Sequence, residues 1–271
     1  MEEYAGKTAI VTGGGSGLGR ELCIELARAG AKVYAADINL EGAEKTAGKI
    51  ADLGGRAQAV KADVRDPDEV GKLVDGAVAE GPLDFMFNNA GIIMFGEFRD
   101  MSYDDWRHFM ESDVMSVIYG TKCAYEVMIR QGHGHIVNTS SIFGAFPFAL
   151  ATGYTAVKHA VTGLSLALRP EAAGLGVKVS VACPGSIDTE VRQSYTVLKG
   201  DRELFNSYIQ KQIGPNAAAL KILRGVSKNK ALIAFPYYDA VFWWLYRIHP
   251  SANEWWMRQI VRLFRKKCRQ E

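Results

Sequence analysis

The protein has 271 residues, of which 48% are hydrophobic and 23% charged, and its formal net charge is +2. This is the composition of an ordinary globular protein, and it excludes a disordered chain, a collagen-like repeat and a strongly basic nucleic-acid coat. The four cysteines lie far apart, which argues against a disulfide framework and a structural zinc site. The acidic N-terminus reaches a strand-like run by Thr8, which leaves no room for a signal peptide. We therefore expect a cytoplasmic protein that binds neither nucleic acid nor a metal ion.

Strand-like apolar runs alternate with helical segments along most of the chain. The runs are rich in Val, Ile and Ala without polar alternation, as in strands covered on both faces, and they occupy residues 8–11, 32–36, 57–60, 83–87, 135–138 and 177–182. Apolar residues at helical spacing occur between them, over residues 18–29, 43–53 and 70–77. This alternation predicts one α/β domain with a doubly wound, Rossmann-type parallel sheet.

The second half of the chain contains longer elements. Residues 103–128 and 154–173 are predicted as long helices that span the sheet, with Pro170 weakening the end of the second. Residues 186–230 are predicted as a polar connection with modest helical character at 192–212 and 216–225, and a connection this long is usually a functional lid or a mobile segment. A last strand follows at 231–235. We expect a catalytic domain over residues 1–235 and an aromatic, basic extension over 236–271.

A glycine-rich turn follows the first strand, in Thr12-Gly13-Gly14-Gly15-Ser16-Gly17-Leu18-Gly19-Arg20. Such glycines let the backbone approach a pyrophosphate at the positive end of the next helix, so the predicted contacts are Gly13, Ser16, Gly17, Leu18 and Gly19. Asp37 ends the second strand, where a carboxylate can accept both adenosine-ribose hydroxyls and repel a 2′-phosphate. The alternative is that Asp37 caps the next helix, although Asn39 is also able to do so. We expect NAD as the cofactor, with NADP as the alternative.

Five ordered motifs resemble the short-chain dehydrogenase/reductase family over about residues 5–235. They are Thr12-Gly13-x-x-x-Gly17-x-Gly19, Asn88-Asn89-Ala90-Gly91, Ser140-Ser141, Tyr154-x-x-x-Lys158 and Pro184-Gly185-x-Ile187-x-Thr189. Taken alone, the tyrosine and lysine four residues apart are more typical of a solvated helix face. The order and spacing of the whole set carry the resemblance.

The resemblance implies an oxidoreductase that transfers a hydride between the nicotinamide and a lipophilic secondary alcohol or ketone. Tyr154 is implied to be the general acid/base, Ser141 to bind the substrate oxygen, and Lys158 to hold the nicotinamide ribose and lower the tyrosine pKa. Further cofactor contacts are implied for Asp63, Val64, Asn89, Ala90, Gly91, Pro184, Gly185, Ile187 and Thr189. The family forms dimers and tetramers through its two long helices, so a homodimer or homotetramer is expected.

Asp113 departs from the family pattern, which usually has an asparagine in the fourth helix whose carbonyl holds a water of the proton relay. Its carboxylate adds a negative charge, which is expected to raise the tyrosine pKa or to engage Lys158. This departure motivates an alternative function as a cofactor-binding regulatory protein with weak turnover. The motifs are also compatible with an NADP-dependent ketoreductase, an epimerase or a dehydratase.

Aromatic residues mark two further regions. Phe143, Phe146 and Phe148 are predicted either to line a substrate pocket or to pack in the core, and Met94 and Phe95 are candidates for the same wall. Residues 236–246 are aromatic, and residues 247–271 carry seven Lys/Arg against two Asp/Glu, with apolar residues at helical spacing. This pattern is typical of a peripheral membrane helix, or of a segment that packs on the body or at a subunit interface.

Overall fold

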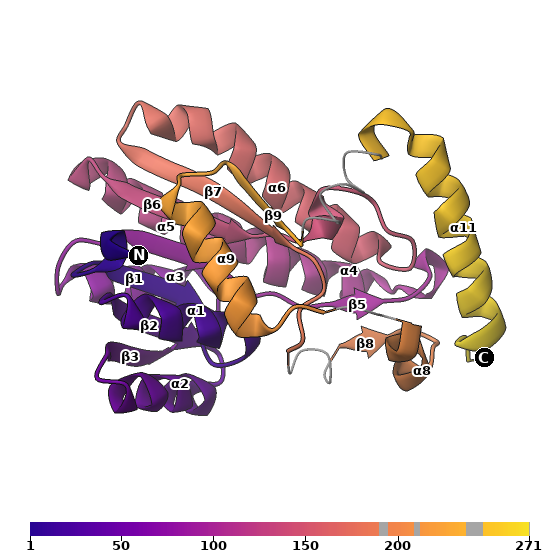
Figure 1. Cartoon of the computed structure of the whole chain (residues 1–271), viewed down its shortest axis with the longest axis horizontal. Coiled ribbons are helices and arrows are strands. Elements are labelled where there is room, and N and C mark those ends of the chain that lie inside the picture. The colour runs from indigo at the N-terminus through magenta and orange to yellow at the C-terminus, as the bar shows by residue number, and fades with distance from the viewer. Residues whose placement is uncertain (190–194, 209–211, 237–245, 271) are drawn as a thin grey trace.

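A seven-stranded parallel sheet forms the centre of the protein, in a computed structural model that describes residues 1–189, 195–208, 212–236 and 246–270. The strand order is β3-β2-β1-β4-β6-β7-β9 (Figure 1). The strands are β1 (Thr8–Thr12), β2 (Lys32–Asp37), β3 (Arg56–Lys61), β4 (Phe85–Asn88), β6 (Gly134–Thr139), β7 (Val177–Pro184) and β9 (Leu232–Phe235). Because all strands run in the same direction, their carboxyl ends lie along one edge of the sheet, where α/β proteins bind their ligands.

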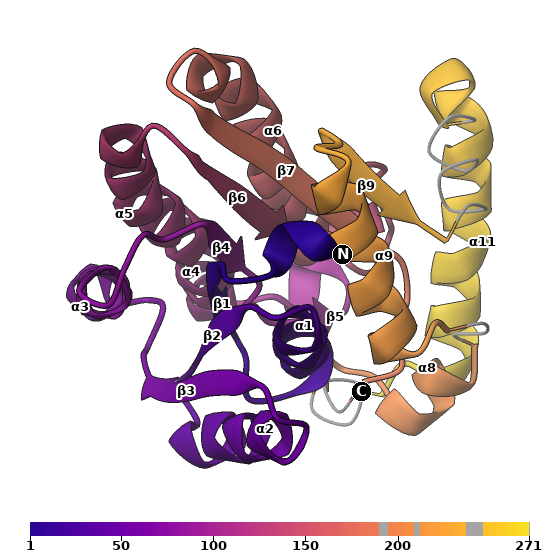
Figure 2. The same ribbon diagram turned by 60° about the vertical axis from the view of Figure 1, so that its left-hand side comes forward.

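Helices cover both faces of this sheet, as Figure 2 shows. One layer consists of α1 (Gly17–Arg28), α2 (Leu40–Asp52) and α9 (Pro215–Ser227). The other consists of α3 (Pro67–Val78), α5 (Ser116–Gln131) and α6 (Thr152–Ala173). Each layer packs on the sheet through its own cluster of buried residues. The predicted doubly wound α/β sheet is confirmed.

Helix starts follow local capping chemistry in the sequence. Asn39 caps α2 by accepting a hydrogen bond from the amide of Gly42 at 3.2 Å. Asp66 caps α3, which has Pro67 in its first turn, and Ser102 forms a capping box with Asp105 at the start of α4 (Tyr103–Phe109). Each cap supplies an acceptor to amides that a helix start leaves without a partner.

The predicted helix over residues 103–128 has a more complex form. It consists of α4, a π-helical segment over Met110–Met115, and α5, which continues to Gln131. A π segment shifts the hydrogen-bond register within a helix and often marks a functional site. Here it carries Asp113. In α6 the helix continues three residues past Pro170 and ends at Ala173.

The helical character predicted over residues 192–212 is only partly confirmed in the described residues. Thr196–Val197 form strand β8, which pairs in parallel with β5 (Met94–Phe95), and only Arg202–Tyr208 form a helix, α8. The two adjacent β-branched residues Thr196 and Val197 favour the extended conformation. The strand cannot continue through Lys199, because this residue has a left-handed backbone conformation with φ +49°. Residues 190–194 and 209–211 lie outside the described residues.

The tail contains helix α11 (Pro250–Lys267), which lies beside α8 at one end of the molecule (Figure 1). Its Phe264 side chain and Cys268, just beyond it, are buried against the body. This part of the tail therefore packs on the body of the protein. Trp243 and Trp244, which belong to the predicted membrane contact, lie outside the described residues. Among the described residues, every helix is too short or too polar to cross a membrane.

Candidate active site

One cavity of about 980 Å³ runs along the carboxyl ends of the strands. It lies where β1 and β4, the neighbours at which the strand order reverses, open toward the same edge. The structure brings together in its lining Gly13, Ser16, Gly17, Leu18, Gly19, Asp37, Asp63, Val64, Asn89, Ala90, Gly91, Ser141, Tyr154, Lys158, Pro184, Gly185, Ile187 and Thr189. Asp113 is the predicted site residue that lies behind the lining.

The glycine-rich turn has the shape of a phosphate cradle. Gly13 has φ +67°, and a Cβ on Gly19 would come within 2.0 Å of the Gly13 carbonyl oxygen, so neither position accepts a side chain without rearrangement. Ser16 precedes α1 in an extended conformation, and its side chain caps none of the described amides of that helix. The first amides of α1 are therefore available to an anionic group at the cavity, which fits the pyrophosphate of a dinucleotide.

Asp37 is held in place by two backbone amides. Its Oδ2 accepts a hydrogen bond from the amide of Gly15, and its Oδ1 accepts one from Asn39, both at 2.9 Å. Since Asn39 itself caps α2, Asp37 is left to line the cavity. A carboxylate fixed beside the phosphate cradle fits the hydroxyls of an adenosine ribose.

Thr12 joins the carboxyl ends of β1 and β4. Its Oγ1 accepts hydrogen bonds from the amides of Asn89 at 2.9 Å and Ala90 at 3.1 Å, and the Asn89 side chain donates to the Thr12 carbonyl at 3.1 Å. These bonds fix the loop that carries the Asn-Ala-Gly motif. The glycine-rich motif includes Thr12 but does not indicate that this residue positions the neighbouring loop. The only sign of that role in the sequence is a hydroxyl residue at the end of a buried strand.

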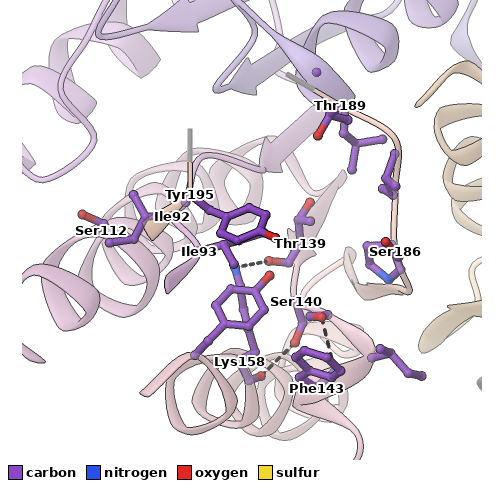
Figure 3. Close-up of a pocket in the computed structure, with 18 of the residues that line it drawn as sticks. Ile92, Ile93, Ser112, Thr139, Ser140, Phe143, Lys158, Ser186, Thr189 and Tyr195 are labelled. Carbon is purple, nitrogen blue, oxygen red and sulfur yellow. Dashed lines mark hydrogen bonds between the residues drawn. The ribbon is translucent and has the colours of Figure 1, made fainter. Parts of the chain in front are cut away.

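Tyr154 and Lys158 point inward from α6 and not to solvent. Tyr154 is 8% and Lys158 3% exposed, which rules out the solvated helix face as their environment. The Lys158 ammonium lies 5.5 Å from the centre of the Tyr154 ring. It donates a hydrogen bond to the Thr139 carbonyl at 3.2 Å, as Figure 3 shows. A positive charge at this distance favours the ionised tyrosine.

The two adjacent serines after β6 have different partners. Ser141 lies in the cavity lining with Tyr154 and lowers the pKa of the tyrosine, and its Oγ accepts a hydrogen bond from the amide of Phe143 at 3.2 Å. Ser140 donates instead to the Lys158 carbonyl at 2.8 Å and thereby holds the turn of α6 that carries the lysine. The hydroxyl beside the tyrosine is therefore that of Ser141.

Asp113 forms a buried ion pair with Lys158. Its Oδ1 lies 2.8 Å from the ammonium nitrogen, and both side chains are almost fully buried. The other carboxylate oxygen, Oδ2, accepts a hydrogen bond from the amide of Ile92 at 3.1 Å. A Cβ on Gly91 would come within 2.6 Å of the carboxylate, so the glycine provides the space for this pair.

These charges act on the tyrosine in opposite directions. Burial raises the pKa of Tyr154, the charge of Lys158 lowers it, and Asp113 raises it again, with a net increase. Burial lowers the pKa of Lys158, but the charges of Asp113 and Tyr154 outweigh it and the net pKa is raised. Lys158 is therefore kept protonated, and part of its effect on Tyr154 is offset by Asp113.

The part of the cavity beyond Tyr154 is apolar. Phe95, Phe143, Phe146 and Phe148 line it, whereas Met94 packs in the adjacent apolar cluster. Sequence motifs do not predict the rest of this wall, which comes from distant elements without a shared pattern: Tyr195, Phe205, Trp256, Met257, Ile260 and Leu263. The described side chains of this wall carry no charge.

Comparisons with known proteins agree with this geometry. The family model of the short chain dehydrogenase matches residues 7–197. Cyclohexanol dehydrogenase of an Acinetobacter species is 38% identical over 69% of this chain and 75% of that protein. 3β-Hydroxysteroid dehydrogenase 2 of Eggerthella lenta is 36% identical over 69% of this chain and 73% of that protein.

A solved structure extends the agreement to the fold. A short chain dehydrogenase/reductase from Burkholderia phymatum, crystallised in complex with NAD, superposes with a TM-score of 0.84 at 25% identity, covering 93% of this chain and 97% of that one. Together with the family match over residues 7–197, these relatives show that the chain belongs to the short-chain dehydrogenase/reductase family.

Proposed function

We propose that the protein is an NAD-dependent oxidoreductase that interconverts a lipophilic secondary alcohol and its ketone. The observation that carries this proposal is the buried group of Ser141, Tyr154 and Lys158. It stands between a phosphate-binding turn on one side of the cavity and an uncharged aromatic wall on the other. This arrangement supports a role for Tyr154 as a proton acceptor between a bound dinucleotide and an apolar substrate.

The residues at the centre would act on the hydroxyl group of the alcohol. Tyr154, as the phenolate, takes the hydroxyl proton, and Ser141 donates a hydrogen bond to the same oxygen. Lys158 stabilises the phenolate through its charge, and Asp113 keeps the lysine protonated and in place. When bound, NAD supplies the hydride acceptor for the carbon that carries this oxygen.

The choice of NAD over NADP follows from Asp37. Its carboxylate is fixed by two amides beside the phosphate cradle, where a 2′-phosphate would meet a like charge. The structural relative from Burkholderia phymatum was crystallised with NAD, which supports the same choice.

The apolar wall indicates the substrate class. An uncharged aromatic surface binds hydrocarbon and offers no counter-charge to a phosphate or carboxylate. Two relatives are named for a cyclohexanol and a 3β-hydroxysteroid, which are alicyclic secondary alcohols. We therefore propose an alicyclic or similarly bulky secondary alcohol as the substrate.

A panel of secondary alcohols tests this function. Purified protein is mixed with NAD or NADP and with cyclohexanol, 4-cyclohexylcyclohexanol or a charged hydroxy acid, and the absorbance of the reduced nicotinamide is followed. We expect turnover of the two apolar alcohols with NAD and little with the hydroxy acid. Preference for NADP would favour an NADP-dependent ketoreductase, and cofactor binding without turnover of any alcohol would favour a regulatory protein.

We further propose a homodimer or homotetramer formed through α6. Over three turns, the exposed residues of this helix are Ala156, His159, Ala160, Gly163, Leu166 and Ala167, without a single Asp, Glu, Lys or Arg. The solvent face of a surface helix is normally charged or polar. Apart from His159 and Leu166, this face consists of alanine and glycine, and such a face fits a second copy of the same helix.

A further inference from the structure

Helix α11 forms one wall of the cavity through a single face. The residues that line the cavity recur at helical spacing and are Asn253, Trp256, Met257, Ile260 and Leu263. Side chains three and four residues apart lie on the same side of a helix. The face begins at the loop after β6, where the Met257 sulfur lies 3.4 Å from the amide nitrogen of Ala149.

The C-terminal end of α11 is anchored by buried acidic residues. Arg269 forms two contacts with Asp100, at 2.6 and 3.0 Å, and a third with Glu97 at 3.0 Å, and Arg265 also pairs with Glu97. The side chain of Glu97 is only 6% exposed, and that of Asp100 only 10%. A bidentate arginine–carboxylate pair fixes orientation as well as distance.

Apolar and backbone contacts complete this anchor. Phe264 is buried against Phe205 of α8, with ring centres 6.0 Å apart, and the Cys268 carbonyl accepts a hydrogen bond from the amide of Asp201 at 2.8 Å. The amide of Gln270 donates to the Lys199 carbonyl at 2.9 Å. The helix therefore has a fixed position relative to the cavity.

A continuous aromatic path leads from the catalytic tyrosine toward this wall. The Phe143 ring lies 6.2 Å from Tyr154 and stacks on Phe148 at 4.5 Å. Tyr154, Phe143, Phe148 and Ile260 belong to one apolar cluster. A molecule whose oxygen lies at Tyr154 meets Phe143 first, and only a longer apolar group extends along this path to α11.

We propose that the cavity face of α11 is the subsite for the apolar part of the substrate that lies far from the reacting carbon. This inference rests on the proposed function for the position of the substrate oxygen. Trp256 is central to it, because its side chain lines the cavity and is still 57% exposed. A bulky apolar ligand covers that surface and gains binding energy, whereas a small alcohol does not reach it. The protein therefore selects secondary alcohols with a second apolar ring or a chain of similar length.

Two adjacent tryptophans provide a matched test. Trp255 is 62% exposed, much like Trp256, but it does not line the cavity. Calorimetry measures the binding of 4-cyclohexylcyclohexanone and of cyclohexanone to the protein saturated with oxidised NAD, a mixture that cannot turn over. The measured quantity is the ratio of the two dissociation constants, bulky ketone to cyclohexanone. Trp256→Ala is expected to raise this ratio about tenfold, because only the bulky ketone loses contacts. Trp255→Ala is expected to leave this ratio within about twofold of wild type.

The outcomes separate this inference from the proposed reaction. An unchanged ratio in Trp256→Ala, an equal change in Trp255→Ala, or a wild-type protein that fails to bind the bulky ketone overturns the subsite. If the ratio changes as expected but no alcohol is turned over, the subsite is supported and the proposed reaction fails. If apolar alcohols are turned over while the ratio is unchanged, the reaction is supported and the subsite fails.

The anchor has its own matched pair of variants. Asp100→Asn weakens the contact with Arg269, and Glu254→Gln breaks the exposed Arg258–Glu254 pair on the outer face of the same helix. We expect faster hydrogen exchange at the C-terminal end of α11 and weaker binding of the bulky ketone in Asp100→Asn only. Equal behaviour of the two variants would contradict a role for the anchor in positioning the wall.

Discussion

Asp113 limits how strongly Lys158 lowers the pKa of Tyr154, the proposed general acid/base. The carboxylate contacts the ammonium at 2.8 Å, and both groups are shielded from water. A buried charge that is paired keeps its position, whereas one left alone is costly. The acidic residue therefore stabilises the protonated lysine, but it also raises the pKa of Tyr154. Alcohol oxidation, which needs the phenolate, is expected to increase with pH.

The substitution Asp113→Asn tests this balance. It keeps the shape of the side chain and removes the negative charge that raises the pKa of Tyr154. While Lys158 remains protonated, the tyrosine should ionise more readily, and the rise of kcat/KM with pH should move to lower pH. The measurement is the pH profile of kcat/KM for alcohol oxidation. An unchanged profile, or a shift to higher pH, would contradict the assigned effect of the carboxylate.

Asp37 is predicted to set the cofactor preference. In Asp37→Ala the acceptor for the ribose hydroxyls is lost, together with the negative charge that opposes a 2′-phosphate. We expect weaker NAD binding and a smaller advantage of NAD over NADP, measured as the ratio of the two dissociation constants. A wild-type protein that already prefers NADP would show that the assignment of this carboxylate is wrong.

At the level of single residues, the motifs predicted the cavity lining around the glycine-rich turn and Tyr154, but neither the wall contributed by α8 and α11 nor how the lining residues contact one another. The position of Asp113 in the chain suggested an added charge near the site. Its contact with Lys158 depends on the π segment and on the missing Cβ of Gly91, and both are properties of the folded chain. Local sequence does not carry that information.

The elements of the sheet contain a pH-sensitive contact away from the site. His135 on β6 is buried, and its Nε2 lies 2.8 Å from the hydroxyl oxygen of Ser180 on β7. Ser180 gives its own proton to the Lys230 carbonyl at 2.6 Å, so the histidine must donate. Burial first, and then the nearby charges of Lys178 and Arg169, lower the pKa of His135 to about 3.

This histidine should make the protein less stable as the pH falls. An unfolded histidine has a pKa of about 6.5, so below that value the unfolded state binds one more proton than the folded state. The free energy of unfolding should then decrease by up to about 1.4 kcal/mol per pH unit from this group. Denaturant unfolding between pH 7 and 4 measures the slope, which His135→Gln should reduce. The exposed His249 provides the control, and an equal reduction in His249→Gln would contradict the account.

At the level of elements, periodicity predicted the sheet and its main helices because buried strands and amphipathic helices have local signatures. The strand β8 and the π segment were not predicted. The first exists because Thr196 and Val197 pair with β5, which lies about a hundred residues earlier in the chain. Tertiary contacts also decide the position of α11, which packs on the body of the protein. Its composition alone fits a membrane surface equally well.

For the whole molecule, the apolar outer face of α6 is the basis for the proposed oligomer. Ala160 lies in the middle of this face, so Ala160→Glu would place a charge in the interface. We expect light scattering to give the mass of a dimer or tetramer for wild type and a smaller assembly for the variant. Ala51→Glu, at an exposed alanine of α2, should keep the wild-type mass. A monomeric wild type would refute the proposed interface.

The proposed reaction assigns the proton transfer to Tyr154, and one paired measurement tests this assignment most directly. Wild type and Tyr154→Phe are compared for reduction of NAD by 4-cyclohexylcyclohexanol, with NAD binding measured in parallel. The variant keeps the ring but loses the group that accepts the proton, so kcat should fall by at least about 100-fold while the dissociation constant of NAD stays nearly unchanged. If Tyr154→Phe keeps more than about a tenth of the wild-type kcat, Tyr154 is not the general acid/base and the proposed mechanism is contradicted.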